Sequence, residues 1–290
     1  MSCIDQVVTD RYTAIHGDCV ESLRDLPDQC IGYSIFSPPF ASLYTYSNSP
    51  RDMGNVRNDA EFFEHFDYLI AELRRVMKPG RNVSFHCMDM PSSKERDGVI
   101  GLKDFPGDLL RAFQRHGFIY HSKATIWKDP VTAMTRTKAL GLLHKSIRER
   151  SEMCRMGIPD YLITVRAPGE SEHVTHTADE FPVDMWQRYA SPVWMDINPS
   201  ETLQYASARE HDDERHICPL QLEVIRRGVM LWTNPDDIVL SPFMGIGSEG
   251  YVSLEMGRRF VGVELKASYY QQATRNLDAA TRKMDDLFAV

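Results

Sequence analysis

Short apolar segments alternate with longer amphipathic segments along most of this chain. Residues 31–36 are rich in β-branched and aromatic side chains, which is typical of a buried strand, and residues 59–77 carry an aromatic-rich apolar stripe at helical spacing, which we interpret as core. Strands are expected at 11–16, 31–36, 82–87, 118–127, 161–165, 238–240 and 259–263, and helices just after Asp18 and at 59–77, 108–116, 140–150, 219–232, 249–256 and 267–284. Such alternation predicts an α/β fold, with a mostly parallel sheet and helices on both faces.

The turn Ser37-Pro38-Pro39-Phe40 directly follows the strand expected at 31–36. Proline has a fixed φ and no N–H group, so two prolines stiffen the turn and let the preceding carbonyls point outward. A hydroxyl, a carbonyl and an aromatic ring held close together accept hydrogen bonds from an amino group and stack on the ring that carries it. A turn of this kind can also simply end a strand, but a second, glycine-rich strand end later in the chain favours a functional site.

That second strand end is the segment 241–250, which follows the strand expected at 238–240. Gly245, Gly247 and Gly250 match the G-x-G-x-x-G fingerprint between a strand and a helix, and Glu264 stands at the end of the next strand, where an acid holds ribose hydroxyls. The match alone does not separate NAD from S-adenosylmethionine, and a tight strand–helix turn is a third interpretation.

The proline turn favours methyl transfer over hydride transfer. The exocyclic amine of cytosine or adenine is a poor nucleophile, because its lone pair is delocalised into the ring. Hydrogen bonds from its two N–H groups to the Ser37 hydroxyl and the Pro38 carbonyl would localise that lone pair during attack on a sulfonium methyl group. The base must first leave the duplex, and Phe40 would provide the stacking platform.

At these two motifs the chain resembles the DNA amino-methyltransferases, which methylate cytosine N4 or adenine N6. Residues 37–40 look like their catalytic motif, (D/N/S)-P-P-(Y/F/W), and residues 241–247 look like their cofactor motif, D-P-F-x-G-x-G. The catalytic motif comes first, which is the circularly permuted order of the family's β class. The resemblance implies a Rossmann-like fold in which 1–127 is the catalytic half, 128–215 an inserted target-recognition lobe and 216–290 the cofactor-binding half.

The resemblance also implies roles for individual residues. Asp18 would contact the adenine region of S-adenosylmethionine, Glu264 its ribose, and the segment 216–220 its methionine moiety, although this segment departs from the usual H-P-x-x-K-P form. The implied catalytic residues are Ser37, Pro38, Pro39 and Phe40, and the implied cofactor-binding residues are Asp18, Pro219, Ser241, Pro242, Phe243, Gly245, Gly247, Ser248 and Glu264. Serine in place of Asp or Asn at position 37 favours cytosine N4 over adenine N6.

The charge of the chain is unevenly distributed. The net charge is −8, but residues 131–155 contain six Lys and Arg against two Glu. A basic patch on an acidic body is what a local phosphate-binding face requires, and a solvated helix face is the alternative. The candidates for DNA phosphate contacts are Arg136, Lys138, Lys145, Arg148 and Arg150.

The remaining composition is that of a globular cytoplasmic protein. The six cysteines are scattered without a Cys-x-x-Cys pair, which favours reduced thiols, and no apolar run reaches the ~18 residues of a membrane helix. The N-terminus lacks the pattern of a signal peptide. His173, His176, His211 and His216 come with no convincing set of further ligands, so we expect no metal site.

The sequence therefore predicts an enzyme that transfers a methyl group from S-adenosylmethionine to an amino group of a flipped base in double-stranded DNA. Methylation of RNA or of a protein glutamine, a repressor of the same fold without turnover, and an NAD-dependent oxidoreductase are the alternatives. A homodimer and a cognate restriction enzyme are left open by the resemblance.

Overall fold

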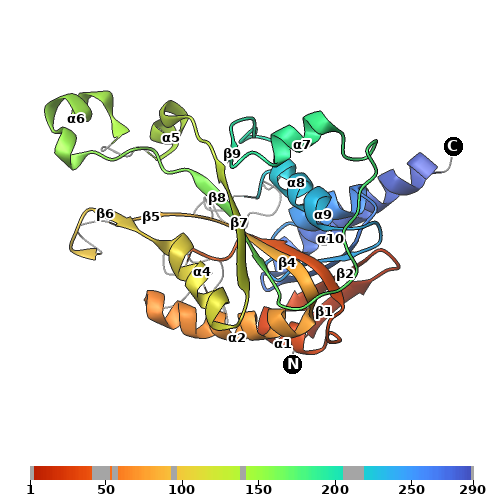
Figure 1. The fold of residues 1–290 in the computed structure, drawn as a ribbon. Helices are drawn as coiled ribbons and strands as arrows, with labels where there is room; N and C mark the ends of the chain where they lie inside the picture. Colours follow the sequence, from red (N-terminus) through yellow and green to blue (C-terminus); the bar gives the residue numbers. More distant parts are fainter. Residues whose placement is uncertain are drawn as a thin grey trace.

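The computed structural model describes residues 3–40, 53, 58–92, 97–137, 142–204 and 219–288. In this part of the chain nine strands form one sheet, in the order β1-β2-β11-β10-β3-β4-β8-β7-β9, and β5 and β6 pair separately (Figure 1). The strands are β1 (Cys3–Val8), β2 (Tyr12–Gly17), β3 (Ile31–Phe36), β4 (Met77–Met88), β5 (Met90–Ser92), β6 (Gly101–Lys103), β7 (Ile119–Ile126), β8 (Asp160–Arg166), β9 (Val193–Trp194), β10 (Ile238–Ser241) and β11 (Arg259–Glu264). The helices are α1 (Cys19–Arg24), α2 (Asp59–Val76), α4 (Phe105–Arg115), α5 (Pro130–Thr137), α6 (His144–Glu149), α7 (Val183–Tyr189), α8 (Leu222–Trp232), α9 (Ser248–Glu255) and α10 (Ala267–Phe288).

The centre of the sheet consists of parallel strands. β2, β11, β10, β3 and β4 lie side by side in parallel, and β1 and β8 join them in antiparallel pairing. From β3 the chain continues to β4 on one side, whereas from β10 it continues to β11 on the other. The strand order therefore reverses between β3 and β10, and open α/β sheets bind ligands at the carboxyl ends of the strands at such a point.

Helices cover both faces of the sheet. Residues of α1, α2 and α4 pack in one hydrophobic cluster, and residues of α8, α9 and α10 pack in a second. In Figure 1 the first set of helices lies below the sheet and the second set above it. This arrangement confirms the predicted Rossmann-like α/β fold with a mostly parallel sheet.

Helix α2 illustrates how the sequence pattern builds the core. The helix begins after Asn58, whose side-chain oxygen accepts a hydrogen bond from the Glu61 N–H at 3.0 Å. Phe62 and Phe66 are fully buried, and their rings stack with centroids 5.3 Å apart. The aromatic stripe therefore belongs to the core, as the spacing predicted.

Several boundaries differ from the expectation. β4 begins at Met77 rather than at residue 82, because Met77 already pairs with Ile31 of β3. α4 begins at Phe105 rather than at residue 108, because the Asp104 side chain caps it by accepting a hydrogen bond from the Gly107 N–H at 2.9 Å. The edge strand β1 and the β5–β6 hairpin were not predicted, since both are short or exposed.

Residues 128–215 contribute both to the sheet and to a projection beyond it. β8 lies between β4 and β7, so this strand is part of the main sheet. The helix expected at 140–150 is described only as α6, and α5, which was not predicted, precedes it. In Figure 1, α5 and α6 project beyond the sheet on the same side as the β5–β6 hairpin.

Arg227 of α8 attaches the segment around α7 and β9 to the rest of the molecule. Its side chain is 1% exposed and forms ion pairs with Asp196 at 2.7 Å and Glu223 at 3.0 Å. The guanidinium also lies 5.0 Å from the ring centroids of both Tyr189 and Trp194, at cation–π distance.

Candidate active site

The proline turn and the glycine-rich loop leave the sheet next to each other. Because β3 and β10 are parallel neighbours, the segments that follow them emerge at the same edge. The Ser34 hydroxyl donates a hydrogen bond to the Leu240 carbonyl at 3.0 Å, and the rings of Phe36 and Phe243 lie 5.7 Å apart between centroids. The two motifs, far apart in the sequence, therefore meet at the switch point.

The proline turn is anchored on one side and accessible on the other. Pro38 is buried, while Ser37, Pro39 and Phe40 are partly exposed. The Phe40 ring lies 6.1 Å from the Phe105 ring and packs on the core. A ring supported in this way offers a firm face for stacking.

Sequence reasoning missed three side chains that adjoin this turn. His86, near the end of β4, places Nδ1 3.2 Å from the Ser37 hydroxyl oxygen. On the other side of its ring, Nε2 lies 3.3 Å from one carboxylate oxygen of Asp160, and the Lys128 Nζ lies 2.6 Å from the other oxygen. The signal for His86 was its place near the end of the strand after the proline turn, whereas Asp160 and Lys128 lie in the stretch assigned to a separate lobe.

The Asp160 carboxyl remains ionised although it is buried. Burial by itself raises its pKa, but His86 and Lys128 outweigh burial and hold the pKa below its usual value. A buried carboxylate paired in this way presents a fixed negative charge to the imidazole ring.

The glycine-rich loop has a backbone that requires its glycines. Gly245 and Gly247 adopt φ values of 55° and 87°, in the left-handed region. No atom of the described residues lies within 4 Å of where a Gly245 side chain would begin, whereas a side chain at Gly250 would collide with Leu277 and Phe260. Gly245 thus leaves room for a ligand, and Gly250 lets α9 pack closely.

Glu264 links this loop to the end of β11. Its carboxylate accepts hydrogen bonds from the Gly245 N–H and the Lys266 N–H, both at 2.8 Å. Two backbone donors hold the carboxylate in place at the edge where the resemblance puts a ribose.

Two buried hydroxyls also belong to this loop. Ser241 ends β10 and Ser248 begins α9, and neither hydroxyl has a hydrogen-bond partner within the described part of the chain. Between them Pro242 is buried and Phe243 is partly buried. Unsatisfied buried hydroxyls beside a loop with open space fit a polar ligand that would complete their hydrogen bonds.

The other predicted cofactor residues lie at the ends of neighbouring elements. Asp18 follows β2 and caps α1, because its carboxylate accepts the Glu21 N–H at 2.9 Å, as its spacing predicted. Pro219 precedes α8 and is partly exposed, whereas the rest of the predicted methionine-binding segment, up to residue 218, lies outside the described residues.

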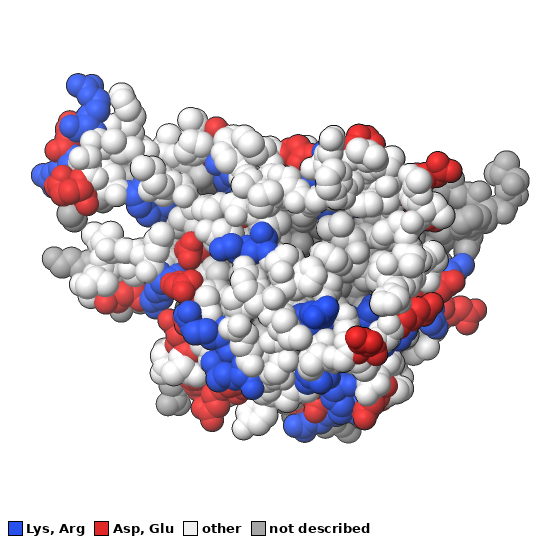
Figure 2. All heavy atoms as spheres, viewed as in Figure 1, with Lys and Arg blue, Asp and Glu red and all other residues white. Residues whose placement is uncertain are grey.

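Three of the predicted DNA-contact side chains lie on the α6 projection. Lys145, Arg148 and Arg150 are exposed, and Lys145 lies 4.0 Å from Glu149. Figure 2 shows Lys and Arg gathered at this projection, with acidic side chains beside them. Lys138 and the Arg136 side chain lie outside the described residues.

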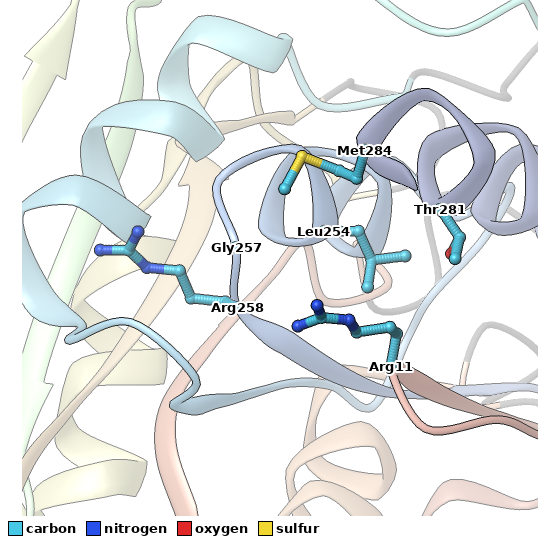
Figure 3. Close-up of a pocket in the computed structure, with 6 residues that line it drawn as sticks. All are labelled: Arg11, Leu254, Gly257, Arg258, Thr281 and Met284. Atoms are coloured by element: carbon cyan, nitrogen blue, oxygen red, sulfur yellow. The ribbon is translucent and has the colours of Figure 1, made fainter. Parts of the chain in front are cut away.

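A separate hollow lies at the opposite edge of the sheet. It is lined by Arg11, Leu254, Gly257, Arg258, Thr281 and Met284 (Figure 3). Arg11 and Arg258 directly precede β2 and β11, so the hollow is at the amino ends of the strands and does not belong to the candidate site. Within the described residues, no group of three His, Cys, Asp or Glu side chains could hold a metal ion, and no helix is long and apolar enough to cross a membrane.

The fold and the two motifs at its switch point define a Rossmann-like methyltransferase. Residues 33–275 match the family model described as DNA methylase. Since this match covers most of the chain, the protein belongs to the DNA methylase family, as its motifs indicated.

Curated relatives resemble the chain over most of its length. The type II methyltransferase M.BglII of Bacillus subtilis is 23% identical over 259 residues, which cover 88% of this chain but 65% of that protein, slightly less than two thirds. The DNA adenine methyltransferase YhdJ of Escherichia coli K12 is 23% identical over 281 residues, which cover 93% of this chain and 83% of that protein.

Solved structures share the fold. The DNA modification methylase TTHA0409 of Thermus thermophilus, solved in complex with S-adenosyl-L-methionine, matches with a TM-score of 0.67 at 20% identity, over 94% of this chain and 96% of that chain. The PvuII DNA methyltransferase, which is cytosine-N4-specific, matches with a TM-score of 0.66 at 16% identity, over 97% of this chain and 93% of that chain.

Proposed function

We propose that this protein transfers a methyl group from S-adenosylmethionine to an exocyclic amino group of a base in double-stranded DNA. The observation that carries the proposal is the meeting of the proline turn and the glycine-rich loop at the switch point, with Phe36 and Phe243 in contact. One segment suits an amine and the other a nucleoside, so methyl donor and acceptor would lie side by side.

The glycine-rich loop and Glu264 suit the cofactor. Open space over Gly245, the unsatisfied hydroxyls of Ser241 and Ser248 and the fixed Glu264 carboxylate fit an adenosine whose ribose donates hydrogen bonds. Asp18 and Pro219 would flank the adenine and methionine ends, as the family motifs imply. When bound, S-adenosylmethionine supplies an electrophilic methyl group on a sulfonium.

The proline turn suits the amine. The Ser37 hydroxyl and the Pro38 carbonyl would each accept one N–H of the amino group, which leaves the nitrogen lone pair directed at the methyl group. Phe40 would stack on a base that has left the duplex, because its ring is supported by Phe105 and partly exposed.

Cytosine N4 is the favoured atom and adenine N6 the alternative. Ser37 at the head of the motif supports cytosine, and the PvuII enzyme of similar fold is cytosine-N4-specific. YhdJ, however, is an adenine methyltransferase of comparable similarity. Both amines present two N–H donors to the same two acceptors, so the turn accommodates either.

The surroundings of the site remain predictions. Residues 128–215 would recognise the target sequence, and a homodimer or a cognate restriction enzyme would be its protein partners. The cytoplasmic location inferred from the scattered cysteines also stays a prediction.

A methyl-transfer assay with a labelled cofactor tests this function. The wild-type protein is incubated with labelled S-adenosylmethionine and with DNA, RNA or protein in parallel, and modified DNA is sequenced to identify the base. We expect label in DNA alone, at an amino group of cytosine or adenine. Label in RNA or protein instead, or in no substrate, contradicts the proposal.

Matched variants separate the two halves of the site. Ser37→Ala should lower the transfer rate by about 10²–10³-fold, the cost of one preorganised hydrogen bond, and Phe40→Ala by about 10- to 100-fold, since stacking contributes about 1–3 kcal/mol per base. Both should retain cofactor affinity in calorimetry, whereas Glu264→Ala should lose it. Wild-type rates in both turn variants would remove these residues from the chemistry.

A further inference from the structure

Four side chains from four different segments form a continuous line of contacts that ends at the proline turn. Ser37 follows β3, His86 lies in β4, Asp160 begins β8, and Lys128 follows β7. His86 pairs with Leu162 across the β4–β8 ladder, so Asp160, two residues earlier, is its diagonal neighbour on the same face. The order of strands in the sheet therefore places the imidazole ring between a hydroxyl and a carboxylate.

The charges in this line determine which nitrogen of His86 carries hydrogen. The Asp160 carboxylate, with Lys128 on its other oxygen, lies 3.3 Å from Nε2 and favours the tautomer with hydrogen on Nε2. Nδ1 is then an acceptor, and the nearest donor is the Ser37 hydroxyl at 3.2 Å. The His86 side chain is 12% exposed and that of Asp160 is 6%, so water competes little for these contacts.

A serine hydroxyl has one hydrogen and two lone pairs, so the direction of its hydrogen decides what it can bind. If the hydrogen points to the incoming amine, it occupies the lone pair that must attack the methyl group. If it points to His86, only oxygen lone pairs face the amine, and Ser37 can accept an N–H.

We propose that His86 is a positioning residue that binds the Ser37 hydrogen and so makes Ser37 a hydrogen-bond acceptor toward the substrate, with Asp160 fixing the His86 tautomer. The inference rests on the proposed function and adds a specificity to it. With Ser37 and the Pro38 carbonyl both accepting, the site selects ring systems that carry an amino group. A keto oxygen at the same position would face two acceptors, and such a mismatch is strongly rejected.

The kinetic test compares three substitutions of His86 on the DNA that the wild-type protein methylates. His86→Ala and His86→Gln should lower kcat by about 10- to 100-fold, the usual cost of misoriented groups, while the KM for S-adenosylmethionine is unchanged. Asn places an oxygen acceptor near the position of Nδ1, so His86→Asn should recover most of the rate, whereas Gln reaches toward Asp160 instead. Equal rates in the three variants, high or low, overturn the proposal.

A double variant separates positioning from packing. If His86 acts through the Ser37 hydroxyl, His86→Ala should have no further effect on kcat in a Ser37→Ala protein. A loss of the same factor in both backgrounds would mean that the ring supports the turn without acting on the hydroxyl, and this result overturns the proposal.

A spectroscopic measurement tests the tautomer without requiring activity. Nitrogen-15 shifts of the full chain, with His86 assigned by comparison with His86→Asn, should show hydrogen on Nε2 and none on Nδ1, and Asp160→Asn should weaken this preference. Hydrogen on Nδ1 in the wild-type protein overturns the inference. Absence of methyl transfer to DNA by the wild-type protein would instead contradict the proposed function, and the spectrum would still decide the tautomer.

Discussion

Carboxylates in the cofactor half of the molecule differ sharply in their surroundings. Glu264 at the end of β11 accepts two backbone N–H groups and stays partly exposed. Glu249, in the first turn of α9, is 4% exposed, and burial together with the nearby Glu264 charge raises its pKa to about 8. One carboxylate is thus prepared to bind a ligand as an anion, while the other is held in its neutral form within the core.

The raised pKa of Glu249 predicts a pH-dependent stability. The folded protein holds a proton on Glu249 that the unfolded chain releases above its usual pKa of 4.5, so the stability falls as the pH rises from about 4.5 to about 8. Glu249→Gln removes this titration. Its free energy of unfolding, measured in urea, should therefore exceed that of the wild-type protein by about 2 kcal/mol more at pH 8 than at pH 6. The exposed Glu64→Gln serves as control, and a difference that is the same at both pH values would contradict the prediction.

Three neighbouring strands are joined at the amino edge of the sheet by one buried ion pair. Arg81 of β4 donates to the Gly32 carbonyl of β3 at 3.0 Å and forms an ion pair with Asp237, which directly precedes β10. The side chains of Arg81 and Asp237 are 5% and 7% exposed. Because this edge is opposite the active site, the pair stabilises the strand order that brings the two motifs together without taking part in the chemistry.

Removing one partner of this pair should destabilise the fold. Asp237→Ala or Arg81→Met leaves a buried charge without its partner, at a cost of about 3–5 kcal/mol in urea unfolding. The double variant should cost less than the sum of the two, since no charge is left unpaired. Arg111→Met, which breaks an exposed pair with Asp108 on α4, should change stability by no more than about 1 kcal/mol. Additive losses in the double variant would show that the two side chains act independently.

At the scale of the molecule, two projections arise from the edge that carries the active site. The β5–β6 hairpin follows the carboxyl end of β4, and α5 and α6 follow that of β7, which runs parallel to β4 because both are antiparallel to β8. The basic side chains of α6 lie on one of these projections, although the chain as a whole carries a net charge of −8 (Figure 2). This arrangement places positive charge where a duplex approaching the proline turn would pass.

The placement of these charges predicts a salt-dependent affinity for DNA. Replacing Lys145, Arg148 and Arg150 together by Gln should reduce the slope of log affinity against log salt by about 2–3, since each phosphate contact contributes about 0.9. Fluorescence anisotropy with duplex DNA at several salt concentrations measures the slope. Replacing Arg24, Arg111 and Arg115 of α1 and α4 by Gln changes the net charge equally and should leave the slope unchanged. An equal change in both triple variants would mean that only total charge matters.

Much of the architecture followed from local patterns in the chain. The bounds of β3 agree with the expected 31–36, and Asp18 caps α1 where its spacing predicted. The errors have a common cause: β1, the β5–β6 hairpin and α5 are short or exposed, so no periodic apolar pattern marks them. β8 was recognised as a strand, but its place between β4 and β7 depends on pairing with segments distant in the sequence.

The sequence by itself determined the proline turn and the glycine-rich loop, because proline and glycine restrict or free the backbone in any context. It also determined the alternation of strands and helices, which reflects burial of one side of each element. The tertiary structure alone decided that the two motifs meet and that His86, Asp160 and Lys128 line up behind Ser37. Those contacts depend on the register and order of the strands, and packing over the whole molecule decides both.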